Sequence, residues 1–265
     1  RPLPDDEMAA RNALRIAQLV LQFHVYGSGI GRHGRGSGMK NQRDDTGVRY
    51  FFTGEFRKYK KMFERHCPPP MKVPKGMQLC KCHEARGWMY YLCSGRMKVY
   101  VNNCEGNDRI VAFLEKDTIF GLDHFSPEQT SLVTIECMTD AWVMPFDGRT
   151  LETMIHENPE FAVELTRYYC KIVRQLCHDA QSQSVNNVFV RTIDFLRINW
   201  GEEDNSRVPL SQRDIAEAVN CSRSSIARVC RALKQAGVIV SEGVGFRIVD
   251  HAGLSALRGK YVSFR

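Results

Sequence analysis

The chain has 265 residues, enough for about two domains, and its content of 43% hydrophobic residues is ordinary for a globular protein. It contains no uninterrupted run of about 18 apolar residues, so the sequence excludes a membrane-spanning helix. The net charge of +7 permits a polyanionic partner but does not require one.

Residues 1–48 differ in composition from the rest of the chain. The stretch 27–38 is rich in glycine, as flexible linkers are. An amphipathic helix can precede it at residues 5–25, but the pattern has no further feature that indicates a function. We therefore predict a flexible N-terminal extension over residues 1–48.

Residues 49–157 have the pattern of a β-domain. Met97, Val99 and Val101 alternate with polar or amphipathic residues, which predicts a half-buried strand. Residues 104–107 then predict a hairpin turn between strands at 96–103 and 108–115. Glycines recur between the apolar runs, at positions 76, 95, 106 and 121. Repeated short strands with glycine turns favour a barrel, roll or sandwich.

A long helix is predicted over residues 158–185. Its apolar residues recur every three or four positions and form one stripe, made of Phe161, Leu165, Tyr168, Ile172, Leu176 and Ala180. Such a stripe can cover the strands or pair with a second copy of itself. A second helix is expected at 187–200, followed by an acidic surface loop at 201–206.

The last segment, 186–265, contains two helices that are separated by a tight turn. Ser211 and Asp214 have the spacing of a helix-capping pair, and residues 220–222 can form the turn. Ser222 can cap a second helix that continues through Lys234. The run 238–249 predicts a two-stranded hairpin directly after this pair, which is the arrangement of a winged helix-turn-helix.

The second helix has two different faces. A helical wheel places Ile226, Val229, Cys230 and Leu233 on one side. The opposite side carries Ser224, Arg228, Arg231 and Gln235, while Arg223 lies nearer the apolar side at the amino end. Between Arg207 and Gln235, six basic residues stand against two acidic ones, a local charge of +4. This pattern predicts a helix that reads the DNA major groove, because arginine recognises guanine edges and phosphates.

Three segments of the chain resemble the CRP/FNR family of bacterial transcription regulators. They are residues 210–233 (LSQRDIAEAVNCSRSSIARVCRAL), 91–100 (YLCSGRMKVY) and 110–121 (IVAFLEKDTIFG). The resemblance covers about residues 50–250. It implies an α+β fold with an N-terminal β-roll of the cyclic-nucleotide-binding type, a long dimerisation helix and a C-terminal winged helix-turn-helix. It also implies that the chain is a sequence-specific DNA-binding regulator.

The family further implies a homodimer joined along 158–185, with one recognition helix from each subunit in a near-palindromic DNA site. The expected DNA-binding residues are Ser211, Gln212, Ser222, Arg223, Ser224, Ser225, Arg228 and Arg231. Of these, Arg223, Ser224 and Arg228 correspond to the main base-reading positions. The middle one is often Glu in the best-known members, so Ser224 predicts a different half-site. RNA polymerase is an expected partner if the protein is an activator, a choice that the sequence leaves open together with the target genes.

The expected effector domain departs from the cyclic-nucleotide pattern of the family. A bound phosphate needs a charged donor, yet Leu122 replaces the usual Glu and no arginine occurs between Arg109 and Arg149. Asp123 and Glu128 would repel a phosphate. We therefore expect control by a small-molecule or redox signal at an unconventional pocket. For a small organic ligand, the candidate residues are Tyr90, Tyr91, Phe120, Gly121, Leu122, His124, Leu176 and Cys177.

Other signals remain open at this stage. The sequence shows no export signal, so we expect a cytoplasmic protein whose ten cysteines are mostly reduced. Most of these thiols are then expected to be small buried groups. Cys80, Cys82 and Cys104 are candidates for a thiol switch, because basic residues lie near them in sequence. Haem bound through His124 and an iron–sulfur cluster are alternatives, although the Cys80–Cys82 spacing is unusual for a cluster or for zinc. We assign no metal ligands and no cofactor.

Two other classes of protein compete with a regulator. The cysteine content allows a redox- or metal-dependent enzyme, and the strands allow a purely structural or ligand-storing β-roll. Neither class needs arginines on the open face of a short helix, so Arg223 and Arg228 favour the regulator.

Overall fold

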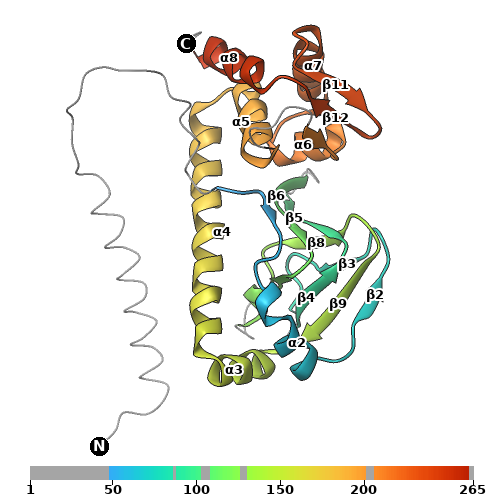
Figure 1. Cartoon of the computed structure of the whole chain (residues 1–265), viewed down its shortest axis with the longest axis vertical. Helices are drawn as coiled ribbons and strands as arrows, with labels where there is room; N and C mark the ends of the chain where they lie inside the picture. Colours follow the sequence, from blue (N-terminus) through green and yellow to red (C-terminus); the bar gives the residue numbers. More distant parts are fainter. Residues whose placement is uncertain (1–47, 86–87, 103–107, 126–129, 201–205, 263–265) are drawn as a thin grey trace, which may run out of the picture. The chain divides into compact units, whose positions relative to one another are not determined.

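The structure is a computed structural model that describes residues 48–85, 88–102, 108–125, 130–200 and 206–262. The predicted N-terminal extension, the helix at 5–25, the 104–107 turn and most of the acidic loop lie outside these residues. An N-terminal β-roll is followed by one long helix and a smaller helical region with its own sheet (Figure 1). The predicted α+β class and the order of its parts are thereby confirmed.

The roll consists of two sheets. One has the order β1-β6-β5-β8-β3 and the other β2-β9-β4-β7. Their strands are β1 (Phe51–Phe52), β2 (Met71–Val73), β3 (Gln78–Cys80), β4 (Met89–Ser94), β5 (Arg96–Asn102), β6 (Asp108–Glu115), β7 (Thr118–Phe120), β8 (Thr134–Cys137) and β9 (Ala141–Phe146). The predicted hairpin strands pair antiparallel as β5 and β6. Gly95, with φ of 101°, turns the chain from β4 into β5, where a Cβ would meet Ala141 at 2.6 Å.

The described part of the roll also contains four short helices whose positions were not predicted from the sequence. They are η1 (Arg57–Tyr59), α2 (Lys60–His66), η2 (Leu122–Phe125) and α3 (Gly148–Glu157). Asp147 caps α3 by accepting a hydrogen bond from the Thr150 backbone at 2.9 Å. Phe63 of α2 packs on Phe146 and Phe161 with ring centroids 5.4 and 5.7 Å apart. These aromatic contacts fix α2 against both the sheet and the long helix.

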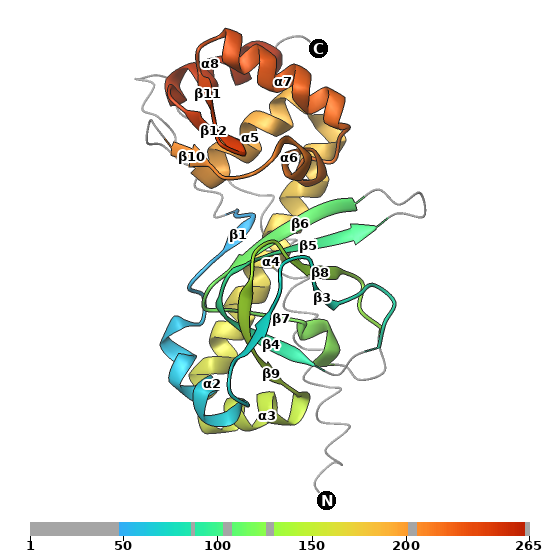
Figure 2. The same cartoon turned by 90° about the vertical axis from the view of Figure 1, so that its right-hand side faces the viewer.

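The long helix, α4 (Pro159–Val185), runs beside the roll (Figures 1 and 2). Its first half buries Phe161, Leu165 and Tyr168 in the roll core, and the Tyr168 hydroxyl donates to the backbone oxygen of Ile119 at 3.2 Å. Beyond Ile172 the predicted apolar stripe no longer covers the roll: Leu176 is 43% exposed and Ala180 is exposed. The polar residues Gln175, Asp179 and Ser182 are buried there instead.

The C-terminal region surrounds a second apolar core. Its elements are α5 (Val188–Trp200), β10 (Ser206–Val208), α6 (Gln212–Ala218), α7 (Arg223–Gln235), β11 (Ile239–Glu242), β12 (Gly245–Ile248) and α8 (His251–Val262). Leu196, Ile215, Ile226, Leu233 and Leu254 are fully buried in this core. No helix in the described ranges combines the length and the apolar character that crossing a bilayer would require.

Candidate nucleic-acid interface and effector region

The first helix of the pair, α6, begins at the capping box that the sequence predicted. Ser211 Oγ accepts a hydrogen bond from the Asp214 backbone at 3.1 Å, and Asp214 Oδ2 accepts one from the Ser211 backbone at 3.0 Å. These bonds satisfy two of the free N–H groups at the helix start. Ile215 and Ala216 are buried against the core, which fixes the axis of α6.

The turn between the helices depends on Asn220. Its φ of 54° lies in the left-handed region, which asparagine tolerates better than most residues. The next amide, Cys221 N–H, donates back to Ala216 at 3.0 Å. Arg191 of α5 donates to the Asn220 backbone oxygen at 3.2 Å. The chain thus reverses direction in the few residues predicted, and α7 starts at once.

The second helix, α7, is capped and anchored as predicted. Ser222 Oγ accepts a hydrogen bond from the Ser225 backbone at 3.2 Å. All four predicted back-face residues, Ile226, Val229, Cys230 and Leu233, are buried. The apolar back therefore holds the helix against the protein and determines which face remains open.

The open face of α7 is cationic. Arg223, Ser224, Arg228 and Arg231 are exposed, and Ser222 is exposed at the helix start. Arg223 points outward because it lies in the first turn, where the apolar core ends. Arg228 Nη2 donates to Ser225 Oγ at 3.4 Å, a long contact that leaves most of the guanidinium group available. With Lys234, α7 carries four cations and no acidic residue.

Ser211 and Gln212 lie at the amino end of α6. Ser211 is partly buried by its capping role, whereas Gln212 is exposed. Ser225 is half-buried and hydrogen-bonded to Ser222 at 2.9 Å. All eight predicted DNA-binding residues thus lie at the starts of the two helices or on the open face of α7. Their contacts with DNA remain predictions.

The predicted wing is formed by β11 and β12, with β10 as an unpredicted third strand. Arg247 donates two hydrogen bonds of 2.8 Å to Glu242 across the hairpin. The bond to Arg247 also lowers the pKa of Glu242. Val244 at the tip is 79% exposed. Gly245 is required next to it, because a Cβ there would lie 1.9 Å from the Val208 oxygen.

Sequence reasoning missed two supports of this region. Arg207 of β10 is 64% exposed and lies 3.8 Å from Glu242, which adds a cation beside the wing. Arg258 of α8 forms a two-pronged ion pair with Asp194 of α5, with Nη2 and Oδ2 3.1 Å apart. The sequence pattern counted Arg207 among the basic residues of 207–235 but did not predict the strand that contains it. That strand, β10, forms by pairing with β12, about 40 residues further along the chain.

The predicted effector residues of the roll do not share one surface. Tyr90 and Phe120 are paired in register between β4 and β7 and stack with centroids 5.1 Å apart. Tyr91 points to the opposite side of β4, because side chains alternate along a strand. Its ring lies 4.5 Å from Phe63, and its hydroxyl donates to Asp117 at 2.9 Å. We therefore correct the placement of Tyr91 beside Tyr90 in a single pocket.

The loop after β7 contains a buried histidine. Gly121 has φ of 77°, and the chain then turns through η2, where His124 N–H donates to the Gly121 oxygen at 3.0 Å. His124 is 4% exposed, and neither of its ring nitrogens has a hydrogen-bond partner among the described residues. Leu122 is partly buried against the roll core. Because an unpaired buried polar group is costly, His124 remains the strongest effector candidate of the loop.

On α4, Leu176 and Cys177 do not face the roll in this chain. Leu176 is 43% exposed and Cys177 is also exposed. The residue that turns inward is Gln175, which is 1% exposed and whose Nε2 has no partner among the described residues. Its neighbour one turn on, Asp179, accepts hydrogen bonds from Tyr50 at 3.0 Å and from Arg109. The sequence analysis did not identify Gln175, because it assigned only apolar residues of this helix to the buried side.

The cysteines are separate thiols in the described part of the chain. Cys80 ends β3 and is 1% exposed, which disfavours it as a thiol switch because reactive thiols are accessible to solvent. Cys82 is half-buried, and its Sγ donates to the Leu132 oxygen at 3.5 Å. Cys104 lies outside the described residues. Within the described ranges, no three His, Cys, Asp or Glu residues are grouped as a metal site would need.

Two protein families match consecutive parts of the chain. Residues 70–158 match the cyclic nucleotide-binding domain, and residues 190–257 match the Crp-like helix-turn-helix domain. The first match covers most of the roll, and the second covers the capped helix pair and the wing. The two domains occur in the order that the structure shows.

Similar proteins match this chain over most of their own length. The cAMP-activated global transcriptional regulator CRP of Pasteurella multocida (strain Pm70) is 20% identical over 180 residues, or 65% of this chain and 86% of that protein. The CRP-like cAMP-activated global transcriptional regulator of Mycobacterium tuberculosis (strain CDC 1551 / Oshkosh) is 24% identical over 195 residues, 70% of this chain and 86% of that protein.

A solved structure shows that the fold is shared. The c-di-GMP responsive global regulator CLP of Xanthomonas campestris superposes with a TM-score of 0.65 at 16% identity, over 73% of this chain and 99% of that one. These relatives are transcriptional regulators, and the enzyme alternative gains no support from them. The chain belongs to the CRP/FNR family and is a DNA-binding transcription regulator with an effector-binding domain.

Proposed function

We propose that this regulator acts as a homodimer that places one α7 from each subunit into the major groove of a near-palindromic site. The observation that carries this proposal is the open face of α7, which presents Arg223, Ser224, Arg228 and Arg231 to solvent without any acidic residue. A buried back and a cationic front are what a groove-reading helix needs. Cytoplasmic location and, for an activator, contact with RNA polymerase belong to the same proposal.

Within this helix, the first two turns read the bases. Arg228 has one long intramolecular contact, so its guanidinium group can form paired hydrogen bonds with a guanine edge. Arg223 supplies a second cation at the amino end of the helix. Ser224, which lies between the two arginines, discriminates only weakly between base pairs. The half-site therefore contains at least one strongly specified guanine beside a position of low selectivity.

The second copy binds along α4. Large apolar side chains stand on its solvent side: Tyr169 is 44%, Val173 51% and Leu176 43% exposed. With Ala180 they recur at spacings of four, three and four, the pattern of a helix pair. Contiguous exposed apolar surface of this kind marks an interface. This interface also explains the predicted apolar stripe: beyond Ile172, the apolar side chains contact the partner helix and not the roll.

The effector is a small molecule other than a cyclic nucleotide, held near His124. Cyclic AMP activates the named relatives, but here the loop offers Leu122 and Asp123 where a phosphate would need a donor. Asp123 is engaged by the Ser131 hydroxyl at 2.7 Å, which fixes a carboxylate in the loop. His124 and Gln175 are buried, and each has side-chain nitrogens without a hydrogen-bond partner among the described residues. They favour a ligand with both hydrogen-bonding and apolar parts.

The effect of ligand binding on the DNA-reading helix would be transmitted through α4. Asp179 near its end binds Arg109 of the roll, and Gln183 one turn later binds Asn220 of the helix-turn-helix at 2.7 Å. A ligand that favours one position of α4 relative to the roll would favour one pose of α7, which is a shift between two populations. Such a shift changes DNA affinity without changing the DNA-reading residues.

Selection of DNA sites from a random library tests the proposal. The full chain is used in air and under anaerobic reduction, with and without small aromatic acids and cyclic AMP. We expect a near-palindrome with half-sites about one DNA turn apart, unchanged by reduction and by cyclic AMP. Enrichment that depends on cyclic AMP or on reduction would overturn the assigned effector class. Failure to enrich any two-fold motif would overturn the dimeric mode of binding.

A further inference from the structure

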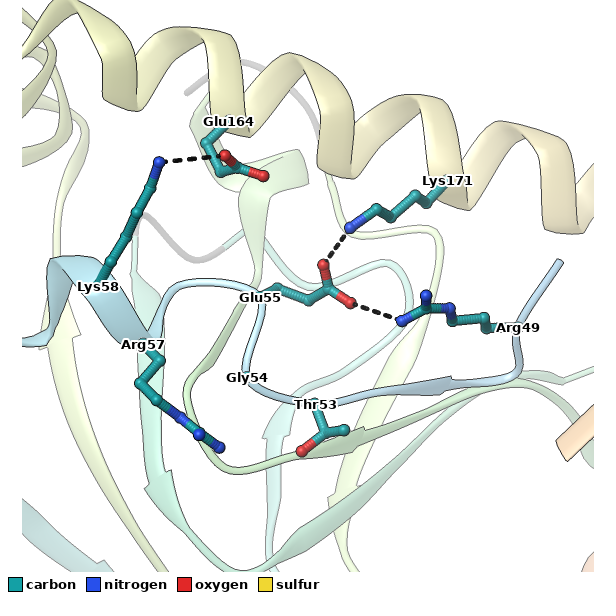
Figure 3. Close-up of a pocket in the computed structure, with 8 residues that line it drawn as sticks. All are labelled: Arg49, Thr53, Gly54, Glu55, Arg57, Lys58, Glu164 and Lys171. Atoms are coloured by element: carbon teal, nitrogen blue, oxygen red, sulfur yellow. Dashed lines mark hydrogen bonds and ion pairs between the residues drawn. The ribbon is translucent and has the colours of Figure 1, made fainter. Parts of the chain in front are cut away.

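A polar pocket lies on the outside of the roll, between the segment after β1 and the long helix α4. It has a volume of about 560 Å³ and is lined by Arg49, Thr53, Gly54, Glu55, Arg57, Lys58, Glu164 and Lys171 (Figure 3). Four cationic and two anionic side chains give this lining a net charge of +2. Neither the DNA-binding face nor the proposed effector region uses any of these residues.

The carboxylates of the pocket are each shared by more than one cation. Glu55, whose side chain is 5% exposed, lies between Arg49 at 3.8 Å and Lys171 (Figure 3). Glu164 lies 3.4 Å from Lys58 and 3.5 Å from Arg167. Each carboxylate therefore neutralises only one of its two neighbouring cations, and the lining keeps an excess of positive charge.

The cations also extend toward solvent. The side chains of Arg49, Arg57 and Lys58 are 56%, 66% and 56% exposed, and that of Lys171 is 34% exposed. The Nε of Arg57 donates a hydrogen bond to Asp117 at 3.1 Å. The terminal nitrogens of Arg57 stay available to a ligand. A guanidinium group anchored through Nε is suited to paired hydrogen bonds with a phosphate.

Dimerisation would leave this pocket open. At about 100° per residue, Lys171 and Glu164 lie about 160–180° around α4 from Val173. The proposed partner helix therefore covers the opposite side of α4. The pocket also differs from the effector region around His124, which lies in the loop after β7.

We propose that the pocket binds an anion bearing two or more phosphate groups, held by Arg49, Arg57, Lys58 and Lys171. The volume falls in the range of small-molecule sites, roughly 300–1,000 Å³, which exceeds what one phosphate fills. Seven of the eight lining residues are polar or charged, so a charged ligand matches the site better than an apolar one. Inorganic pyrophosphate and the phosphate chain of a nucleotide present the same chemistry to these cations.

Calorimetric titration of the full chain with pyrophosphate at low ionic strength tests this assignment. We expect one saturable site per chain, with affinity at least tenfold weaker in the double variant Arg49→Gln/Lys58→Gln. The matched control, Arg65→Gln/Lys72→Gln, removes the same charge from side chains that are 64% and 58% exposed elsewhere. It should stay within twofold of the wild type. Equal losses in both double variants, or no saturable binding, would overturn the proposal.

The DNA-binding arginines are the main competing site for a polyanion. A third variant, Arg223→Gln/Arg228→Gln, should therefore retain pyrophosphate binding, and loss of binding in this variant alone would contradict the assignment. Mass spectrometry of the wild type after acetylation needs no substitution: pyrophosphate should protect Lys58 and Lys171 but not Lys72. Parallel titrations with ATP identify the source, since a nucleotide site binds ATP more tightly than pyrophosphate and a pyrophosphate site does not.

Discussion

Asn220 and Gln183 connect the turn of the helix-turn-helix to the long helix, through a hydrogen bond of 2.7 Å from Asn220 Nδ2 to Gln183 Oε1. Gln183 Nε2 in turn donates to Asp179 at 3.1 Å, and Asp179 binds Tyr50 and Arg109. The turn that orients α7 is therefore joined by three polar side chains to β6 of the roll. This connection is the physical route by which the effector domain can influence the DNA-reading helix.

Replacing Gln183 should loosen the turn. The variant Gln183→Leu removes the acceptor of Asn220, an interaction worth about 1 kcal/mol, which corresponds to about fivefold faster amide exchange through local opening. Hydrogen exchange measured by mass spectrometry on peptides covering residues 219–223 checks this. Gln181→Leu, at an exposed position of the same helix, is the control and should leave exchange unchanged. Equal exchange in both variants would show that the bond does not hold the turn.

The capping serine of α7 should contribute measurably to stability. Ser222→Ala removes the acceptor of the Ser225 amide and should lower the free energy of unfolding by about 1 kcal/mol. Urea unfolding followed by circular dichroism measures the change. Ser241→Ala, at an exposed site in β11, should change it by less than about 0.5 kcal/mol. A loss at Ser222 no larger than at Ser241 would argue against the cap.

The exposed stripe of α4 should control the oligomeric state. Val173→Glu places a charge in the proposed helix pair, and we expect a monomer at concentrations where the wild type is a dimer, because burying an unpaired charge is costly. Sedimentation equilibrium gives the mass of each. Arg167→Glu, whose native side chain is 65% exposed on a different side of α4, should remain a dimer. A dimeric Val173→Glu protein would place the interface elsewhere.

The buried hydroxyl of Tyr50 should make stability fall at high pH. Burial raises the pKa of Tyr50 to about 12 from a usual value of 10.0. A raised pKa means that the unfolded chain loses its proton first, so the contribution is complete below pH 10 and is lost between about pH 10 and pH 12. Between pH 9 and pH 11 the wild type should lose about 1.4 kcal/mol more stability than Tyr50→Phe. Parallel losses in the two proteins, measured by urea unfolding, would contradict this assignment.

Local signals explain why the DNA-binding region could be predicted from the sequence. The Ser211–Asp214 pair, the Ser222 cap and the four back-face residues of α7 depend on neighbours within a few positions, so their pattern determines their structure. The hairpin of β5 and β6 follows from alternation in the same way. In each case one short segment carries both the signal and the contacts.

The parts that could not be predicted depend on distant residues. The apolar pattern of α4 could not show that Gln175 and Asp179 turn inward. Two of the residues that bind Asp179, Tyr50 and Arg109, lie more than 60 residues earlier in the chain. The opposite directions of Tyr90 and Tyr91 follow from the place of β4 between β9 and β7. The burial of Cys80 likewise depends on the pairing of β3 with β8. No local pattern encodes these contacts.

The central claim is that Arg228 of α7 reads a guanine in the major groove, and methylation interference tests it most directly. A methyl group on guanine N7 blocks the acceptor that a paired arginine contact uses. In the selected half-site, methylation of one guanine should abolish binding by the wild type. Arg228→Ala should lose about 1–3 kcal/mol of discrimination at that base pair and become insensitive to its methylation. An identical interference pattern for the wild type and Arg228→Ala would contradict the account.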